Sequence, residues 1–275
     1  MDEVQLSPDR RQVASPLTPE MLAPMDERCE VVQFNQPLTT DEYQRLSDFL
    51  IDYPRVTLRA YSYYQGSFTD FEYLRYFPHI RHFEGQHYLA ESLDGLRHLP
   101  DDLVSLELGK TKKRFSLRAI EHLTNLQLLD LTGFTKDIEV VETMTELRAL
   151  QFRSITLSSL AVLRPLQQLA AFNLIGGGTK DLDALPQLGS LEALGLWQIR
   201  GLSDVSAVGR IATLRYLSLF ELRQVTRLPS FAGCPMLEVI SLNTMNGLTE
   251  IPPEVEALRR AASGKHPALA HWDVK

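Results

Sequence analysis

The sequence has few of the features that mark a secreted, disulfide-bonded or membrane-spanning protein. It contains only two cysteines, Cys29 and Cys234, in 275 residues, and in a stacked fold they would lie too far apart to be bonded to each other. Its first residues lack an apolar stretch that could direct secretion, and no run of about 18 apolar residues could span a bilayer. Asn-x-Ser/Thr acceptor sites are also absent. We therefore expect a cytoplasmic protein; secretion by a route that needs no signal peptide is the alternative.

Concentrated positive charge is lacking as well. The formal net charge is −7 and the isoelectric point is about 5.5, whereas binding to a nucleic-acid backbone needs a basic face. Hydrophobic residues make up 44% and charged residues 23% of the chain, which is normal for a globular protein. The expected partner is therefore a protein, with no nucleic acid, no membrane and no small-molecule substrate.

Patterns typical of enzymes are missing too. The stretch Gly176-Gly177-Gly178-Thr179-Lys180 lacks the spacing of a phosphate-binding loop, and we expect these glycines to form a turn with positive φ. No Gly-x-Ser-x-Gly motif occurs. Cys234, between glycine and proline, lacks neighbours that would stabilise a thiolate. The sequence therefore predicts no enzyme and no cofactor.

Three histidines, His79, His82 and His87, raise the possibility of a zinc site with Glu84. Strand parity opposes it, because residues 82 and 84 share a face whereas residue 87 lies on the other face or in the following turn. No cysteine joins them, and zinc ligands usually come with tighter spacing. We expect ordinary surface histidines and no metal; a metal-dependent hydrolase is the least favoured alternative.

What the sequence does have is a recurring frame, Leu-x-x-Leu-x-Leu, whose successive copies start 21 to 23 residues apart. The copies are Leu103-Leu106-Leu108, Leu126-Leu129-Leu131, Leu147-Leu150-Phe152, Leu169-Phe172-Leu174, Leu191-Leu194-Leu196, Leu214-Leu217-Leu219 and Leu237-Ile240-Leu242. A period in the low twenties with this frame is the leucine-rich-repeat signature. Blocks such as LEALGLWQIRGLSDVSAVGRIAT and LEVISLNTMNGLTEIPPEV make residues 54–258 resemble stand-alone leucine-rich-repeat proteins of the short bacterial type, with repeats of about 22 residues.

The resemblance implies a binding protein and does not name its partner. One departure concerns frame position 9, which is commonly Asn in such repeats. Here position 9 is mostly apolar and predicts an apolar spine: Phe134, Ile155, Gly177, Ile199, Leu222 and Met245.

The frame also predicts how the chain is arranged in space. Positions 4 and 6 of each repeat should point inward from a short strand, and positions 3, 5 and 7 outward. One repeat cannot bury its apolar side chains alone, so neighbouring repeats must stack. We therefore expect an α/β solenoid, a leucine-rich-repeat horseshoe with a parallel concave sheet, an N-terminal β-α cap and a C-terminal helical cap.

Four segments follow from this pattern. Residues 1–27, rich in Pro, Ser and charge, are expected to be a disordered or loosely packed tail. Residues 28–53 are expected to form the N-terminal cap, with a helix that starts at a Thr39–Glu42 capping box. Residues 54–251 would be the repeats, with Val56 taken as 24 residues after Val32. Residues 252–275 would be the C-terminal cap and a tail in which Trp272 covers the last layer.

Outward strand positions give a map of the candidate binding surface. The N-terminal half has an acidic series flanked by arginines, and the C-terminal half is apolar and aromatic; exposed Trp, Tyr and Arg are enriched at interface hot spots. The predicted partner-binding residues are Arg59, Glu84, Glu107, Asp130, Arg153, Ile175, Trp197, Tyr216 and Phe220. Two alternatives stay open: the arginines simply neutralise the carboxylates, or the aromatic residues are covered by the tail or by a second copy of the chain.

These observations predict a non-enzymatic protein–protein interaction module that binds a macromolecular partner on its concave face. A toxin-neutralising, immunity-type protein is one role compatible with it. A secreted bacterial effector acting in a host cell is the alternative.

Overall fold

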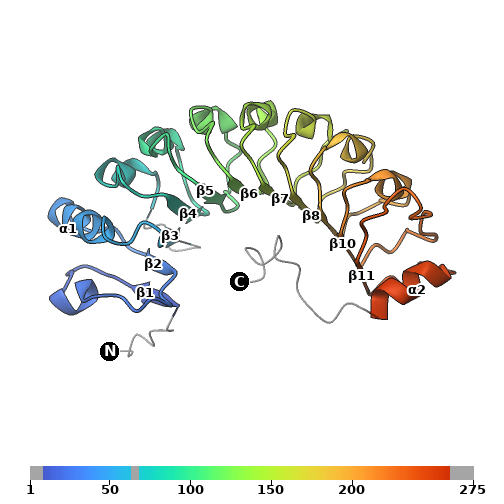
Figure 1. Ribbon diagram of the computed structural model, residues 1–275. Coiled ribbons are helices and arrows are strands. Elements are labelled where there is room, and N and C mark those ends of the chain that lie inside the picture. The colour runs from blue at the N-terminus through green and yellow to red at the C-terminus, as the bar shows by residue number, and fades with distance from the viewer. Residues whose placement is uncertain (1–8, 63–67, 261–275) are drawn as a thin grey trace. The chain divides into compact units, whose positions relative to one another are not determined.

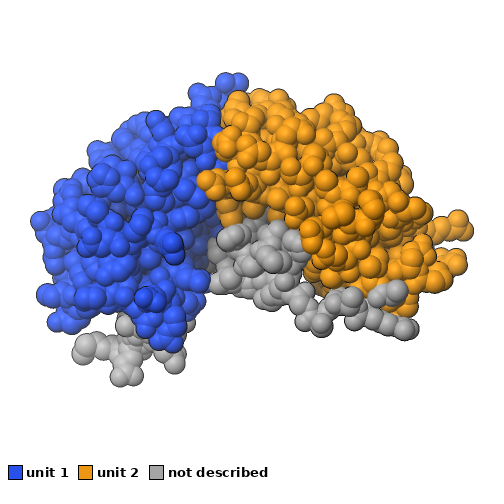
Figure 2. Space-filling model, viewed as in Figure 1, with its two compact units in different colours: residues 1–126 blue, residues 127–275 orange. Residues whose placement is uncertain are grey.

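The computed structural model describes residues 9–62 and 68–260 of the chain. It consists of two compact units, residues 1–126 and residues 127–275, which Figure 2 shows in blue and orange. Both units are built from short parallel strands that are joined mainly by single-turn 3-10 helices (Figure 1).

In unit 1 each strand pairs in parallel with the next one along the chain. The strands are β1 (Arg10–Gln12), β2 (Val31–Phe34), β3 (Thr57–Ser62), β4 (His82–His87) and β5 (Ser105–Leu108). The helices are η1 (Pro19–Leu22), α1 (Thr40–Leu50), η2 (Glu72–Tyr76), η3 (Asp94–His98) and η4 (Leu117–Ile120).

Unit 2 repeats the same pattern with greater regularity, and its strands are again parallel and paired in chain order. The strands are β6 (Leu128–Thr132), β7 (Ala149–Arg153), β8 (Ala171–Ile175), β9 (Ala193–Trp197), β10 (Tyr216–Phe220) and β11 (Val239–Asn243). The helices are η5 (Ile138–Thr143), η6 (Ala161–Leu163), η7 (Leu185–Gln187), η8 (Ser206–Arg210) and α2 (Pro253–Arg260).

The core of unit 2 is the set of inward frame positions that the sequence predicts. The position-4 side chains lie side by side on successive strands and are completely buried: Leu129, Leu150, Phe172, Leu194, Leu217 and Ile240. The expected apolar spine is confirmed at Phe134, Ile155, Ile199 and Leu222, which are all buried. Stacked repeats therefore share one continuous apolar interior.

A residue with positive φ follows every strand of unit 2. These residues are Gly133, Ser154, Gly176, Gln198, Glu221 and Thr244, with φ between 52° and 80°. The backbone N–H of each of the first five donates to the carbonyl at the end of the next strand, at 2.7–2.9 Å. The chain thus leaves each strand through the same left-handed turn, and the positive φ expected in the glycine run is confirmed at Gly176 and Gly177.

The N-terminal region differs from the expectation of a disordered tail. In residues 9–27, β1 pairs with β2, and the Val13 N–H donates to the Gln33 carbonyl at 2.8 Å. Val13 and Leu17 are buried. The expectation is wrong for this segment, because it covers the open edge of β2 and adds a strand to unit 1; residues 1–8 lie outside the described residues.

Strand β3 also departs from the predicted register. Val32 lies opposite Leu58, 26 residues further on, so the 24-residue step from Val32 to Val56 is wrong. Leu58 in turn lies opposite Phe83. The shift of two residues keeps every side chain on its predicted face, but it moves Arg59 from position 7 to position 5, directly opposite Glu84.

Both predicted terminal helices are present. Helix α1 begins at Thr40, and Thr39 before it forms the expected capping box: the Glu42 N–H donates to the Thr39 hydroxyl, and the Thr39 N–H donates to the Glu42 carboxylate. Helix α2 begins at Pro253 and lies against β11. The tail with Trp272 lies outside the described residues. Within residues 9–62 and 68–260, no helix is long and apolar enough to cross a membrane.

Candidate protein-binding surface

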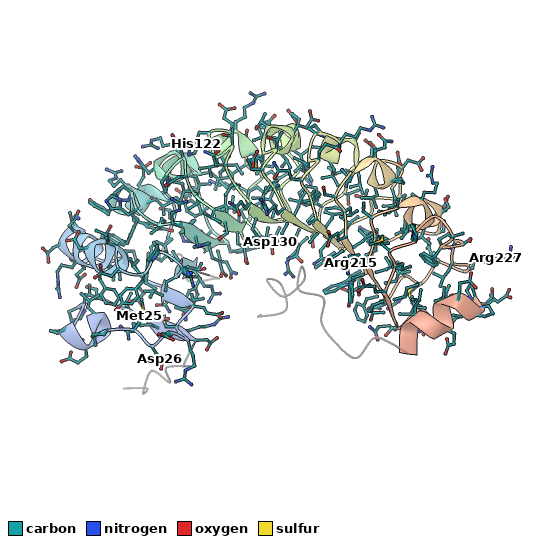
Figure 3. The ribbon with its side chains drawn as sticks, in the orientation of Figure 1. Met25, Asp26, His122, Asp130, Arg215 and Arg227 are labelled. Carbon is teal, nitrogen blue, oxygen red and sulfur yellow. The ribbon has the colours of Figure 1, made fainter. Side chains whose placement is uncertain are left out.

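The outward strand positions of unit 2 lie on the sheet face that carries no 3-10 helices, which we call the helix-free face (Figure 1). Strand register arranges them in three rows that cross the strands. The aromatic row is Ile175, Trp197 and Phe220; the polar row is Asp130, Gln151, Asn173 and Ser218; the alanine row is Leu128, Ala149, Ala171, Ala193 and Tyr216. Figure 3 shows the Asp130 side chain on this face.

The aromatic row contains three of the residues that the sequence predicts to bind a partner. Ile175, Trp197 and Phe220 end the adjacent strands β8, β9 and β10 and lie side by side in register. All three are half-buried. The Trp197 and Phe220 rings meet edge to face, with centroids 6.4 Å apart, and the Trp197 Nε1 donates to the Ser218 hydroxyl at 3.0 Å. These contacts hold the Trp197 indole in one orientation within the protein alone.

The polar row is buried, although its positions point away from the core. Asp130, Gln151 and Asn173 are only 5%, 1% and 1% exposed. Gln151 Nε2 donates to the Asp130 carboxylate, and Asn173 Nδ2 donates to Gln151 Oε1 at 3.2 Å. The half-buried Arg153 forms an ion pair with Asp130 at 3.3 Å. The row therefore satisfies much of its hydrogen bonding internally.

The alanine row lies on the other side of the polar row. Ala149, Ala171 and Ala193 are buried, and Leu128 and Tyr216 pack against them. Tyr216 lies opposite Ala193, whereas Phe220 lies opposite Trp197. Tyr216 therefore belongs to the opposite margin of the face from the aromatic row, and the structure does not bring it together with Trp197.

In unit 1 the predicted acidic residues belong to a side-chain network. Glu84 is 3% exposed, and Arg59 Nε donates to its carboxylate at 2.7 Å. The same guanidinium donates to Gln33 and Gln86 and lies 4.5 Å from the centre of the Tyr61 ring. Gln86 also donates to the half-buried Glu107 at 3.3 Å. The arginine thus neutralises Glu84 from within unit 1.

The histidines that suggested zinc are separated by the sheet. His82 lies at an outward position of β4 in unit 1, where its Nδ1 is 2.8 Å from the Ser105 hydroxyl. His87 is fully buried on the other face between Phe68 and Phe71, with ring centroids 4.8 and 4.3 Å away, so the expectation of a surface residue is wrong. This burial lowers the pKa of His87 to about 3. In the part of the chain that the structure describes, no three His, Cys, Asp or Glu side chains come together as a metal site.

Sequence reasoning placed Gln151, Asn173 and Ser218 at outward positions but did not single them out. Their signal is position 5 of the frame, where short polar residues follow one another on successive strands. What the frame does not reveal is that neighbouring amides bond to one another, because the partners are 21 to 22 residues apart.

Parallel strands, short 3-10 connections and inward leucines at a fixed frame define a leucine-rich-repeat solenoid. Two solved bacterial structures share the fold. An internalin (inlF) from Listeria monocytogenes is 18% identical, with a TM-score of 0.56 over 86% of this chain and 72% of that one. An internalin C2 (inlC2) from the same organism is 20% identical, with a TM-score of 0.52 over 74% of this chain and 84% of that one.

No protein-family model and no curated protein matches the sequence. The likeness to the internalins therefore concerns the fold.

Proposed function

We propose that the chain is a non-enzymatic binding module that holds a protein partner on the helix-free face of unit 2. The observation that carries the proposal is the aromatic row. Three large apolar side chains end three adjacent strands in register, remain half-buried, and include an indole held by Ser218. Rigid aromatic side chains of this kind contribute most of the free energy at many interfaces.

Charge contributes less to this proposal than the sequence suggests. Glu84 is paired with Arg59, and Asp130 with Arg153. Neutralisation of a basic toxin and action as an effector inside a host cell are the two narrower roles that we propose. In both, the aromatic row supplies the affinity, and the ion pair of Arg153 with Asp130, next to Ile175, orients the partner.

The test is a Trp197→Ala/Phe220→Ala double variant. Affinity capture of native partners should fall at least roughly 100-fold, because each aromatic anchor contributes about 2 kcal/mol. The matched control is Ile51→Ala/Met236→Ala, which removes apolar side chains that are 52% and 50% exposed elsewhere. Circular dichroism should show both variants folded. Undiminished capture by the aromatic variant would contradict the proposal.

A further inference from the structure

One loop of unit 1 concentrates positive charge, although the chain as a whole is acidic. It follows β5 and contains Lys110, Lys112, Lys113 and Arg114, four cations in five residues. The whole chain has seven lysines, and three of them lie here. We call residues 110–114 the basic loop. Its four cationic side chains are all exposed, and the net charge of the chain does not reveal them.

The backbone of the basic loop is held in place on unit 1. The Lys112 N–H donates to the Tyr88 carbonyl at 2.7 Å, which ties the loop to the preceding repeat. The Thr111 hydroxyl donates to the Lys113 carbonyl, also at 2.7 Å. These bonds fix where the cationic side chains leave the backbone, so a ligand does not have to order the loop when it binds.

The four cations of the basic loop form no ion pair with any residue that the structure describes. Elsewhere in unit 1 most arginines do form ion pairs. Two carboxylates close to the loop in sequence are engaged in this way, Asp102 with Arg81 and Glu121 with Arg118. Like charges so close together repel one another. A bound anion would offset this repulsion.

The size of the basic loop and its acidic surroundings decide which anion fits. Proteins that bind a nucleic-acid backbone commonly neutralise about 6–10 phosphates along it. Here four cations are available, and Glu107 and Glu121 border them along the chain. A short row of carboxylate side chains matches the four cations without extending over these two glutamates. Arg114 can bind one carboxylate through two N–H groups, and each lysine acts as a point charge.

We propose that the basic loop is a docking site for an acidic segment of a partner protein, with as many Asp or Glu side chains as the loop has cations. Attraction between opposite charges speeds the encounter of such partners and orients them, and it weakens as salt screens exposed charges. The site lies in unit 1 and uses none of the residues of the aromatic row of unit 2. The inference therefore goes beyond the proposed function and does not depend on it.

Binding of a fluorescein-labelled hexaglutamate peptide to the full-length protein, followed by fluorescence anisotropy, tests this inference. Lys112→Gln/Lys113→Gln should bind the peptide on the order of tenfold more weakly than wild type at low salt. The matched control is Lys180→Gln/Arg200→Gln, which removes two exposed cations of unit 2 and should bind as wild type does. Both variants lose two positive charges from the same net charge of −7, so net charge cannot explain a difference between them. Circular dichroism should show both variants folded.

Three results would overturn the inference. One is a wild-type protein that does not bind hexaglutamate, and another is equal affinity of the two lysine and arginine variants for it. The third uses a labelled oligothymidylate of matched charge as a second probe. If it binds more tightly than hexaglutamate and is lost in Lys112→Gln/Lys113→Gln, the basic loop is a nucleic-acid site. Trp197→Ala/Phe220→Ala should bind hexaglutamate as wild type does, which keeps this test separate from that of the proposed function.

Discussion

At the scale of single residues, the fold keeps the imidazole of His87 uncharged. Its ring is stacked between Phe68 and Phe71, and the Tyr73 hydroxyl lies 3.3 Å from its Nε2. Burial lowers its pKa from 6.5 to about 3. Protonation therefore favours the unfolded chain, in which the imidazole is solvated.

This shift predicts how stability depends on pH. The neutral, buried His87 contributes fully to the free energy of unfolding above its unfolded pKa of 6.5. This contribution is lost as the pH falls from there toward 3. We expect the free energy of unfolding to fall by roughly 2 kcal/mol between pH 6.5 and 4.5, as measured by urea denaturation. His87→Leu should remove most of this slope. His79→Gln, at an exposed position, should retain it, and equal slopes in all three proteins would refute the assignment.

The left-handed turns after the strands of unit 2 predict a stabilising substitution. Thr244 has φ of 53°, which is unfavourable for a β-branched residue. Thr244→Gly should therefore raise the free energy of unfolding by about 0.5–1 kcal/mol. Thr226→Gly, at an exposed position without positive φ, should lower it. The two changes are compared by thermal and urea denaturation, and a loss of stability in Thr244→Gly would count against strain at this position.

At the scale of elements, Glu42 joins helix α1 to the N-terminal segment. Its carboxylate accepts from the backbone N–H groups of Thr39 and Leu17, both at 2.8 Å, and from the Ser15 hydroxyl at 3.1 Å. These bonds lower the pKa of Glu42 to about 2, the Thr39 and Leu17 backbone bonds contributing most. One carboxylate thus completes the capping box and fastens the segment that contains β1.

Removing this carboxylate should release both elements. We expect Glu42→Ala to destabilise the protein by about 2 kcal/mol, from the lost cap and the unsatisfied Leu17 N–H. Amide hydrogen exchange should accelerate in residues 10–17 and in the first turn of α1. Asp41, the exposed neighbour of Glu42, makes neither bond, so Asp41→Ala should leave exchange at residues 10–17 unchanged. Slow exchange in both variants would show that the segment is held by other contacts.

The sequence predicts the elements where apolar residues recur at the frame positions. Leu129, Leu150 and Phe172 fall in register because each repeat buries the same two positions. The sequence does not predict strand β1. Its three residues, which end with Arg11 and Gln12, show no alternation of apolar and polar side chains, and they gain their strand conformation by pairing with β2. The register of strand β3 differs from the predicted one by two residues. Val56 and Leu58 are equally apolar, so the sequence does not show which of them lies opposite Phe83; in the structure it is Leu58.

The candidate site, too, has a part that the sequence predicts and a part that it does not. Strand parity is enough to place Trp197 and Phe220 on the outward face. It cannot show that Glu84 is buried under Arg59, since that depends on the register of β3 against β4. Nor can it show that Asn173 ends a chain of amides, since each link joins side chains of different repeats.

At the scale of the whole molecule, a stack of repeats has interior and terminal layers that differ in burial. Leu196, at position 6 of an interior repeat, is fully buried, whereas Leu242, at the same position on β11, is half-buried. Leu196→Ala should cost about 3 kcal/mol, within the range for buried leucines, and Leu242→Ala about 1 kcal/mol. Urea denaturation of the two variants measures the difference. Equal losses would mean that the last repeat is as well covered as an inner one.

The shared left-handed turn keeps the backbone of unit 2 independent of the side chain that ends each strand. The backbone leaves β6 to β10 by the same conformation and the same N–H bond, whatever side chain stands just before it. Thr132, Arg153, Ile175, Trp197 and Phe220 differ in size, charge and shape, yet they occupy equivalent places. The side chains that would face a partner in the proposed function can therefore be exchanged one strand at a time, while the backbone that carries them stays the same.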